Sequence, residues 1–121
     1  MTKVVIERAI DGSFSASATV GDSLFIGVGA TTKEVIKDIR EVIAESYPDL
    51  DDFQYVYDAK SFLGGFRDEM SLSGLEVITG ISQKVLGHYL SGYRNPSKKV
   101  LKKIEDGIHE YASALLNTHI E

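Results

Sequence analysis

The spacing of apolar residues changes once along this chain, near residue 61, and this change limits what the chain can fold into. Residues 13–20 alternate strictly between serine or threonine and an apolar residue, and a period of two predicts a strand with one buried face. After residue 61 apolar residues recur every three or four positions, as they do in amphipathic helices. The sequence therefore predicts an α+β chain with two small domains, residues 1–60 and 61–121.

Residues 1–60 contain the signals of a β-β-β-α-β unit. Asp11-Gly12 is typical of the tight turn between antiparallel strands. Thr31 and Glu34 fit a capping box, in which each side chain binds a free backbone N–H at the start of a helix. The residue before a proline avoids helical angles, so the helix should end before Pro48. The expected strands are residues 3–10, 14–20, 24–28 and 53–57.

Residues 61–121 are expected to be entirely helical, with a glycine-centred turn between two of the helices. Gly80 suits the left-handed position after a helix end, and Ser82 can cap the next helix, Gln83 to about Leu90. Such a helix pair describes a helix-turn-helix. A short helix bearing Phe62, Leu63, Phe66 and Met70 should precede the pair. A last helix, capped by Ser97, should carry on one face Val100, Leu101, Ile104, Ile108, Tyr111, Ala112 and Leu115.

The net charge of −5 is unevenly distributed. Residues 1–60 hold six basic and eleven acidic residues, whereas the stretch Ser82–Lys103 holds six basic residues and no acidic one. Lysines 98, 99, 102 and 103 fall in the opening turns of the last expected helix, where the helix dipole disfavours cations. This placement indicates attraction to phosphates, and a solvated basic face is the alternative.

Several classes of site and protein are excluded or disfavoured by the composition. The absence of cysteine excludes disulfides and thiolate zinc sites, and it agrees with a cytoplasmic location. No signal peptide is expected, because the apolar start runs straight into Glu7-Arg8. The longest apolar run, Leu24 to Ala30, is far too short to span a membrane.

Catalytic and ligand-binding sites are likewise not expected. Gly27-Val28-Gly29 lacks the third glycine of a dinucleotide fingerprint and the Gly-Lys-Ser/Thr of a P-loop. The acidic residues between 49 and 58 lack the glycine and closing glutamate of a calcium loop. Glu7 and Asp11 are too few for a two-metal nuclease. The prediction is a binding protein that is not an enzyme and has no cofactor and no metal.

The helix-turn-helix region resembles a known family. The pattern Leu75-x3-Thr79-Gly80-Ile81-Ser82-x3-Leu86-x2-Tyr89-x2-Gly92-x-Arg94-x-Pro96-Ser97 is similar to the XRE, or lambda-repressor-like, helix-turn-helix. The resemblance implies that the helix from Gln83 to Leu90 enters the major groove of double-stranded operator DNA. By position, base edges would be read by Gln83, Lys84 and His88, and phosphates would be held by Ser82, Arg94, Lys98 and Lys99.

The order of the two halves resembles HicB-like antitoxins. The likeness is carried by Asp11-Gly12-Ser13-Phe14, by residues 29–34 entering the helix and by Tyr57-Asp58-x2-Ser61-Phe62-Leu63 before the helix-turn-helix. It implies a partial RNase H-like domain without catalytic carboxylates, which would occlude HicA, a small basic mRNA-cleaving toxin. The helix-turn-helix would repress the shared operon. The residues that would contact the toxin are not identified by the sequence.

Two further expectations concern assembly and an alternative function. Two-fold operators make a homodimer or higher homo-oligomer the expected state, with the last helix and an open sheet edge as candidate pairing surfaces. The alternative to an antitoxin is a stand-alone helix-turn-helix repressor whose first domain senses a small ligand or only assembles dimers.

Overall fold

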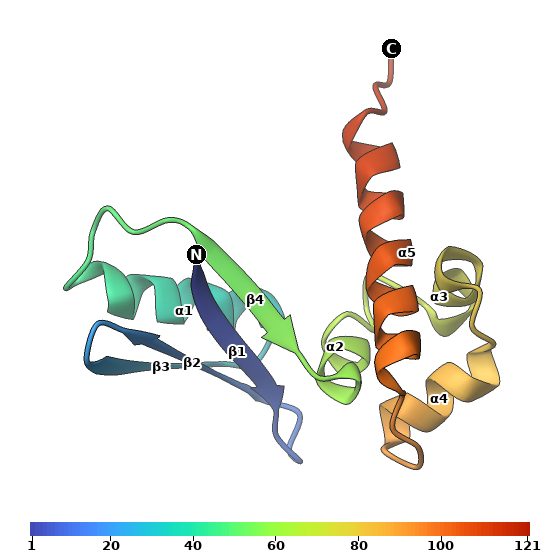
Figure 1. Cartoon of the computed structure of the whole chain (residues 1–121), viewed down its shortest axis with the longest axis horizontal. Helices are drawn as coiled ribbons and strands as arrows, with labels where there is room; N and C mark the ends of the chain where they lie inside the picture. Colours follow the sequence, from blue (N-terminus) through green and yellow to red (C-terminus); the bar gives the residue numbers. More distant parts are fainter. The chain divides into compact units, whose positions relative to one another are not determined.

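The computed structural model describes residues 1–121 and divides the chain into two compact units, Met1–Phe66 and Arg67–Glu121. The first unit is a four-stranded sheet with two helices, and the second consists only of helices (Figure 1). The α+β class predicted from the sequence is confirmed. No helix is at once long enough and apolar enough to cross a bilayer. The first unit contains β1 (Thr2–Arg8), β2 (Phe14–Val20), β3 (Ser23–Gly29), α1 (Thr32–Ala44), β4 (Phe53–Tyr57) and α2 (Ala59–Gly65), and the second contains α3 (Leu72–Thr79), α4 (Gln83–Ser91) and α5 (Lys98–Leu116).

The sheet of the first unit is mixed, with the strand order β3-β2-β1-β4. The first three strands form the expected antiparallel meander, and β4 returns to pair in parallel with β1, so that Val5 lies opposite Val56. A parallel return needs a crossover connection, which α1 supplies. The predicted β-β-β-α-β order is therefore present, with β3 and β4 at the two edges.

The core of the first unit lies between the sheet and α1. The alternating residues of β2 place Phe14, Ala16 and Ala18 on the buried face, and Val35 and Ile39 of α1 are fully buried against them. The capping box at the start of α1 is formed as expected. Thr31 Oγ1 accepts from the N–H of Glu34 at 3.1 Å, and Glu34 Oε2 accepts from the N–H of Ala30 at 2.9 Å.

The glycines of β3 let α1 lie directly on the strand. A β-carbon added to Gly27 would stand 2.8 Å from the backbone nitrogen of Ile39, and one added to Gly29 would stand 2.5 Å from that of Val35. Both distances are shorter than real β-carbon contacts, so only glycine allows this approach. The Gly27-Val28-Gly29 segment is thus a helix-packing site.

Helix α2 belongs to the first unit, although the sequence placed its apolar residues in the second domain. Asp58 caps it by accepting from the N–H of Ser61 at 2.7 Å, and Ser61 Oγ in turn accepts from the N–H of Arg8 in β1 at 2.9 Å. Tyr57 makes edge contacts with the rings of Phe62 and Phe66. The helix ends at Gly65 and does not reach residue 70. The boundary between the units consequently follows residue 66 and not residue 60.

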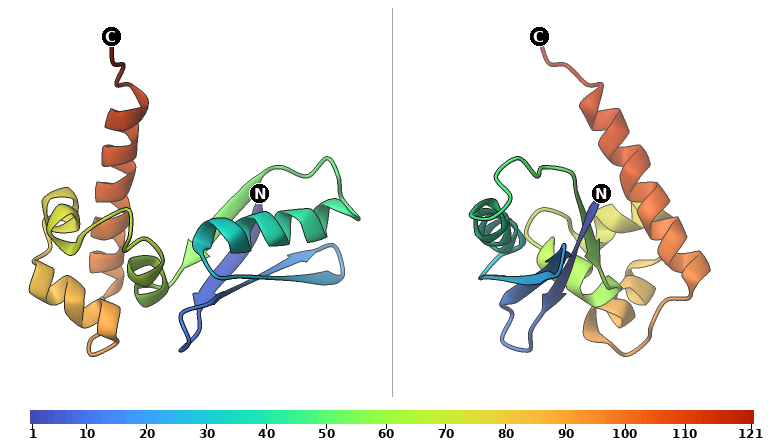
Figure 2. Two further views of the ribbon diagram at one scale, coloured as in Figure 1. Left: turned by 180° about the vertical axis from the view of Figure 1, so that it is seen from behind. Right: turned by 60° about the vertical axis from the view of Figure 1, so that its left-hand side comes forward.

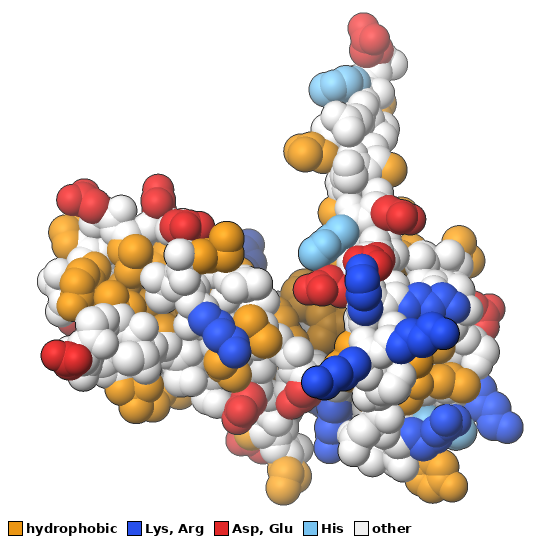
Figure 3. Space-filling view, viewed as in Figure 1, with side chains coloured by type: hydrophobic (Ala, Val, Ile, Leu, Met, Phe, Trp, Pro, Cys, Tyr) orange, Lys and Arg blue, Asp and Glu red, His pale blue; other side chains and the backbone are white.

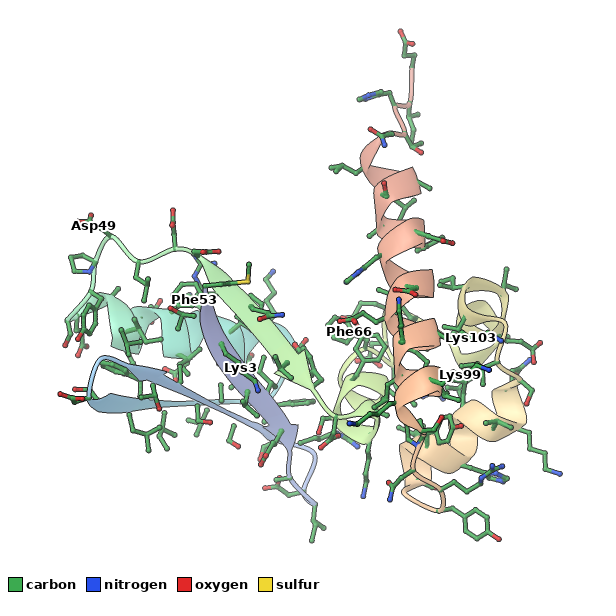
Figure 4. All side chains as sticks on the ribbon, in the orientation of Figure 1. Lys3, Asp49, Phe53, Phe66, Lys99 and Lys103 are labelled. Carbon is green, nitrogen blue, oxygen red and sulfur yellow. The ribbon has the colours of Figure 1, made fainter.

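The face of the sheet opposite α1 is not covered by any helix of the same unit (Figure 2). Lys3 projects from this face (Figure 4), beside a shallow depression of about 530 Å³ that is also lined by Val5, Ser17 and Leu24. Along β3 the side chains of Leu24, Ile26 and Val28 are 64, 56 and 64% exposed. The first unit therefore presents an apolar row at one edge of an open sheet face.

Candidate nucleic-acid interface

The turn between α3 and α4 is built as the sequence predicts. Gly80 ends α3 in the left-handed region, at φ 74°, and its N–H donates to the carbonyl of Glu76. The buried Thr79 hydroxyl donates to the carbonyl of Leu75 at 2.7 Å and accepts from the N–H of Ile81 at 3.2 Å. Because one side chain bonds both sides of the turn, the direction in which α4 leaves α3 is fixed.

The first turn of α4 is held by two oxygen atoms from outside the helix. Ser82 Oγ accepts from the N–H of Val85 at 3.3 Å, and Glu76 Oε1 accepts from the N–H of Gln83 at 2.9 Å. Both acceptors satisfy N–H groups that have no partner within the helix. The contribution of Glu76 was not predicted, because the two residues are seven positions apart and no short motif links them.

Two of the three residues predicted to read bases are exposed, and the third is half-buried. Gln83 and Lys84 are exposed at the start of α4. His88 is half-buried, its ring meets that of Tyr93 at 5.0 Å between centroids, and its buried Nδ1 has no hydrogen-bond partner. The structure thus presents Gln83 and Lys84 to solvent, whereas much of the His88 imidazole faces the following loop.

The predicted phosphate contacts lie at the start of α4, in the next loop and at the start of α5. Ser82 is exposed where α4 begins, although its hydroxyl also serves as the helix cap. Arg94 is exposed in the loop after Gly92, which ends α4 at φ 82°. Lys98 and Lys99 are exposed in the first turn of α5, and neither forms an ion pair. Lys and Arg side chains gather over α4 and the beginning of α5 on the face shown in Figure 3.

The four lysines of α5 divide into two pairs with different surroundings. Lys102 Nζ lies 2.7 Å from Asp106 Oδ2, and this hydrogen bond raises the pKa of Lys102. The Lys103 side chain lies over Gly80, at the carboxyl end of α3, where a cation is favoured by the helix dipole. Lys99 and Lys103 are one turn apart on the same side of α5 (Figure 4). Of these four lysines, only Lys98 and Lys99 therefore have no interaction partner within the chain.

Helix α5 packs on α3 at one close point. A β-carbon on Gly107 would stand 2.6 Å from the carbonyl oxygen of Ile78, so the two backbones touch there. Ile104, one turn earlier, is buried. The apolar face predicted for α5 is buried only in part. Leu101, Tyr111 and Leu115 are 41, 46 and 55% exposed.

A comparison with protein-family models identifies this region. Residues 66–109 match the model described as helix-turn-helix, and this range spans α3, the turn, α4 and the first half of α5. No curated protein and no solved structure matches the chain at a significant level. The helical unit is therefore a DNA-binding helix-turn-helix domain of the kind found in sequence-specific transcription regulators.

Proposed function

We propose that the chain is the antitoxin of a type II toxin–antitoxin pair and also the repressor of its own operon. Residues of the first unit would neutralise a HicA-like mRNA interferase, and the helix-turn-helix would bind the operator. The observation that carries the proposal is the division of charge between two separate compact units. The net charge of −5 lies entirely in residues 1–66, whereas residues 67–121 hold equal numbers of acidic and basic residues.

The division of charge suits two different partners. An acidic unit attracts a small basic protein whose own substrate is RNA, because complementary charge speeds encounter and disfavours wrong partners. The unpaired cations at Lys84, Arg94, Lys98 and Lys99 suit the phosphates of DNA. The match to the family model includes only the last residue of the first unit, so the antitoxin role rests on this charge pattern and on the sequence resemblance to HicB.

The antitoxin role can be tested with the full chain and its neighbouring gene. A short basic protein encoded next to this chain is expected to arrest growth when expressed alone and to copurify with this chain when the two are expressed together. Growth should recover even with a variant that cannot bind DNA. If no neighbouring reading frame encodes such a protein and none copurifies, the antitoxin role is wrong. A ligand-dependent melting shift of the chain would then favour the stand-alone repressor.

We also propose that the first unit has no catalytic role of its own. Glu7 is exposed on β1, and Asp11 lies in the following turn. The Asp11 carboxylate accepts from the hydroxyl and the N–H of Ser13, which lowers its pKa. The Asp11 carboxylate therefore stabilises its own turn. The purified chain should therefore show no nuclease activity, and an activity that is lost in a Glu7→Gln/Asp11→Asn variant would contradict this view.

Base reading by α4 leads to a prediction about Gln83. The Gln83→Ala variant should bind its best operator about 5- to 150-fold more weakly, because a bidentate contact to one base contributes about 1–3 kcal/mol. Binding to unrelated DNA should be unchanged, since phosphate contacts supply it. Selection from a randomised operator library should show relaxed preference at one position of each half-site. An unchanged preference would contradict a recognition role for Gln83.

The exposed apolar residues of α5 favour a homodimer formed by this helix. Tyr111 and Leu115 lie one turn apart on the same side of α5 and are 46 and 55% exposed. The Tyr111→Glu/Leu115→Glu variant is expected to be monomeric in light scattering at micromolar concentration, because it buries like charges in the interface. Ser113→Glu, which adds an acid on the opposite side of the same helix, should remain dimeric. A dimeric Tyr111→Glu/Leu115→Glu variant would place the interface elsewhere.

A further inference from the structure

The edge strand β3 has unused backbone hydrogen-bonding groups. The N–H of Val28 donates to Asp38 Oδ2 at 2.8 Å, so it points away from β2 and toward α1 at the sheet edge. Backbone groups alternate between the two sides of a strand, so those of Leu24 and Ile26 also point away from β2. No strand lies on that side. Both backbone groups of Leu24 and of Ile26 are therefore open, whereas the N–H of Val28 is occupied.

The side of α1 next to this edge is acidic. Glu34 and Asp38 are one turn apart and accept from the N–H groups of Ala30 and Val28, so they lie over the end of β3. Glu45 follows on the same side of the helix, at a spacing of about two further turns. We name Glu34, Asp38 and Glu45 the acidic flank. The opposite side of α1 is basic, because Arg40 lies over the ring of Phe53 in β4 at 5.2 Å.

We propose that β3 binds an extended, basic segment of another polypeptide, which adds a fifth strand to the sheet. Such a segment would pair with the open groups of Leu24 and Ile26. Its alternate side chains would point to opposite faces of the sheet. Those on the open face would pack against the exposed row Leu24, Ile26 and Val28, and those on the other face would meet the acidic flank. The segment that fits alternates apolar and basic residues.

A second copy of this chain fits the edge less well. A two-fold pairing of β3 with β3 would place both α1 helices on the same face of the joined sheet, with their acidic flanks facing each other. Like charges across such an interface oppose binding, and a basic partner gains from the same charges. The inference deepens the proposed antitoxin function, since it names the surface on which a basic toxin would dock.

The edge can be tested without knowing the natural partner. The probe is a nine-residue peptide of alternating Lys and Val with blocked ends, added to the full-length chain while amide hydrogen exchange is followed by NMR. At 90% occupancy the N–H groups of Leu24 and Ile26 should exchange about tenfold more slowly, because exchange then proceeds through the free tenth of the molecules. The N–H groups of Phe25 and Gly27 should be unaffected, since they already face β2. A peptide of alternating Glu and Val should give no protection.

Two charge reversals in the first unit test the contribution of the acidic flank. Glu45→Lys should weaken binding of the Lys–Val peptide about 5- to 10-fold at low ionic strength, and this difference in affinity should shrink as salt is added. Asp51→Lys makes the same change just before β4, at the opposite edge of the sheet, so it should change binding less than twofold. Glu45 and Asp51 are both exposed, and neither accepts a hydrogen bond from a side chain or backbone group.

Several results would overturn the proposal. One is the absence of protection at Leu24 and Ile26, and another is equal protection by the acidic peptide. A third is that these N–H groups already exchange slowly without peptide and that the Ile26→Lys variant loses this protection. A second copy of the chain would then occupy the edge. The antitoxin role is separable from these results. If the natural chain copurifies with a basic neighbour that gives Leu24 and Ile26 no protection, the edge assignment fails and the antitoxin role stands.

Discussion

The Lys98→Glu/Lys99→Glu variant is expected to bind every DNA duplex on the order of 100-fold more weakly at low ionic strength. Both lysines are exposed in the first turn of α5 and have no anionic partner within the chain. If they neutralise two phosphates, the slope of log affinity against log salt should flatten by about 2. The measurement is a titration of operator and unrelated duplexes at several salt concentrations.

The same helix supplies a matched control for this charge reversal. Lys102→Glu/Lys103→Glu makes the same change of net charge one turn later, where Lys102 is paired with Asp106 and Lys103 lies over Gly80. This variant should leave the salt slope nearly unchanged, although it should lower the stability of the helical unit. Equal losses of affinity from the two double variants would show that only net charge matters, and the assignment of Lys98 and Lys99 to phosphates would then be wrong.

The Gly107→Ala variant is expected to lower the stability of the helical unit by about 1–2 kcal/mol. The added methyl group would stand 2.6 Å from the carbonyl oxygen of Ile78, and relieving such a contact by a backbone shift costs about 1–3 kcal/mol. Alanine's higher helix propensity offsets up to about 1 kcal/mol of this cost. Urea unfolding followed by circular dichroism would measure the difference. DNA binding should weaken as well, because α5 carries Lys98 and Lys99.

Gly87→Ala provides the control for Gly107→Ala, because it makes the same substitution within a helix of the same unit. A β-carbon at Gly87 would meet only the Leu72 side chain, at 3.9 Å, which is an ordinary contact. The variant should therefore be as stable as the natural chain or more stable, by up to about 1 kcal/mol. A stable Gly107→Ala variant would mean that α3 and α5 are farther apart in solution than in this structure.

Features specified by neighbouring residues could be predicted from the sequence. The caps at Thr31, Ser82 and Ser97 all accept the expected backbone N–H, because a cap depends on residues only three positions away. The left-handed turn at Gly80 follows for the same reason. These local signals located the helix-turn-helix and most of the α+β order.

Features that depend on contacts between distant residues could not be predicted. Apolar spacing shows which face of α2 is buried, but it does not show which unit the helix packs against. The hydrogen bond from the Arg8 N–H to Ser61 Oγ joins α2 to the first unit. The same spacing gives α5 an apolar face but does not say how much of that face is covered, and in the structure only Ile104 of it is buried. The position of the His88 ring depends on Tyr93, whose location follows from the loop after α4.

The parallel pairing of β1 with β4 affects the order in which the two units of a growing chain can fold. Val5 pairs with Val56, so the sheet cannot be complete until residue 57 has been synthesised. At 5–20 residues per second, roughly 3–13 s then separate the synthesis of residue 57 from that of residue 121. Two-state domains of mixed topology generally fold within such a time. Each new chain can thus complete its sheet, with the open edge of β3, seconds before its DNA-binding unit is finished.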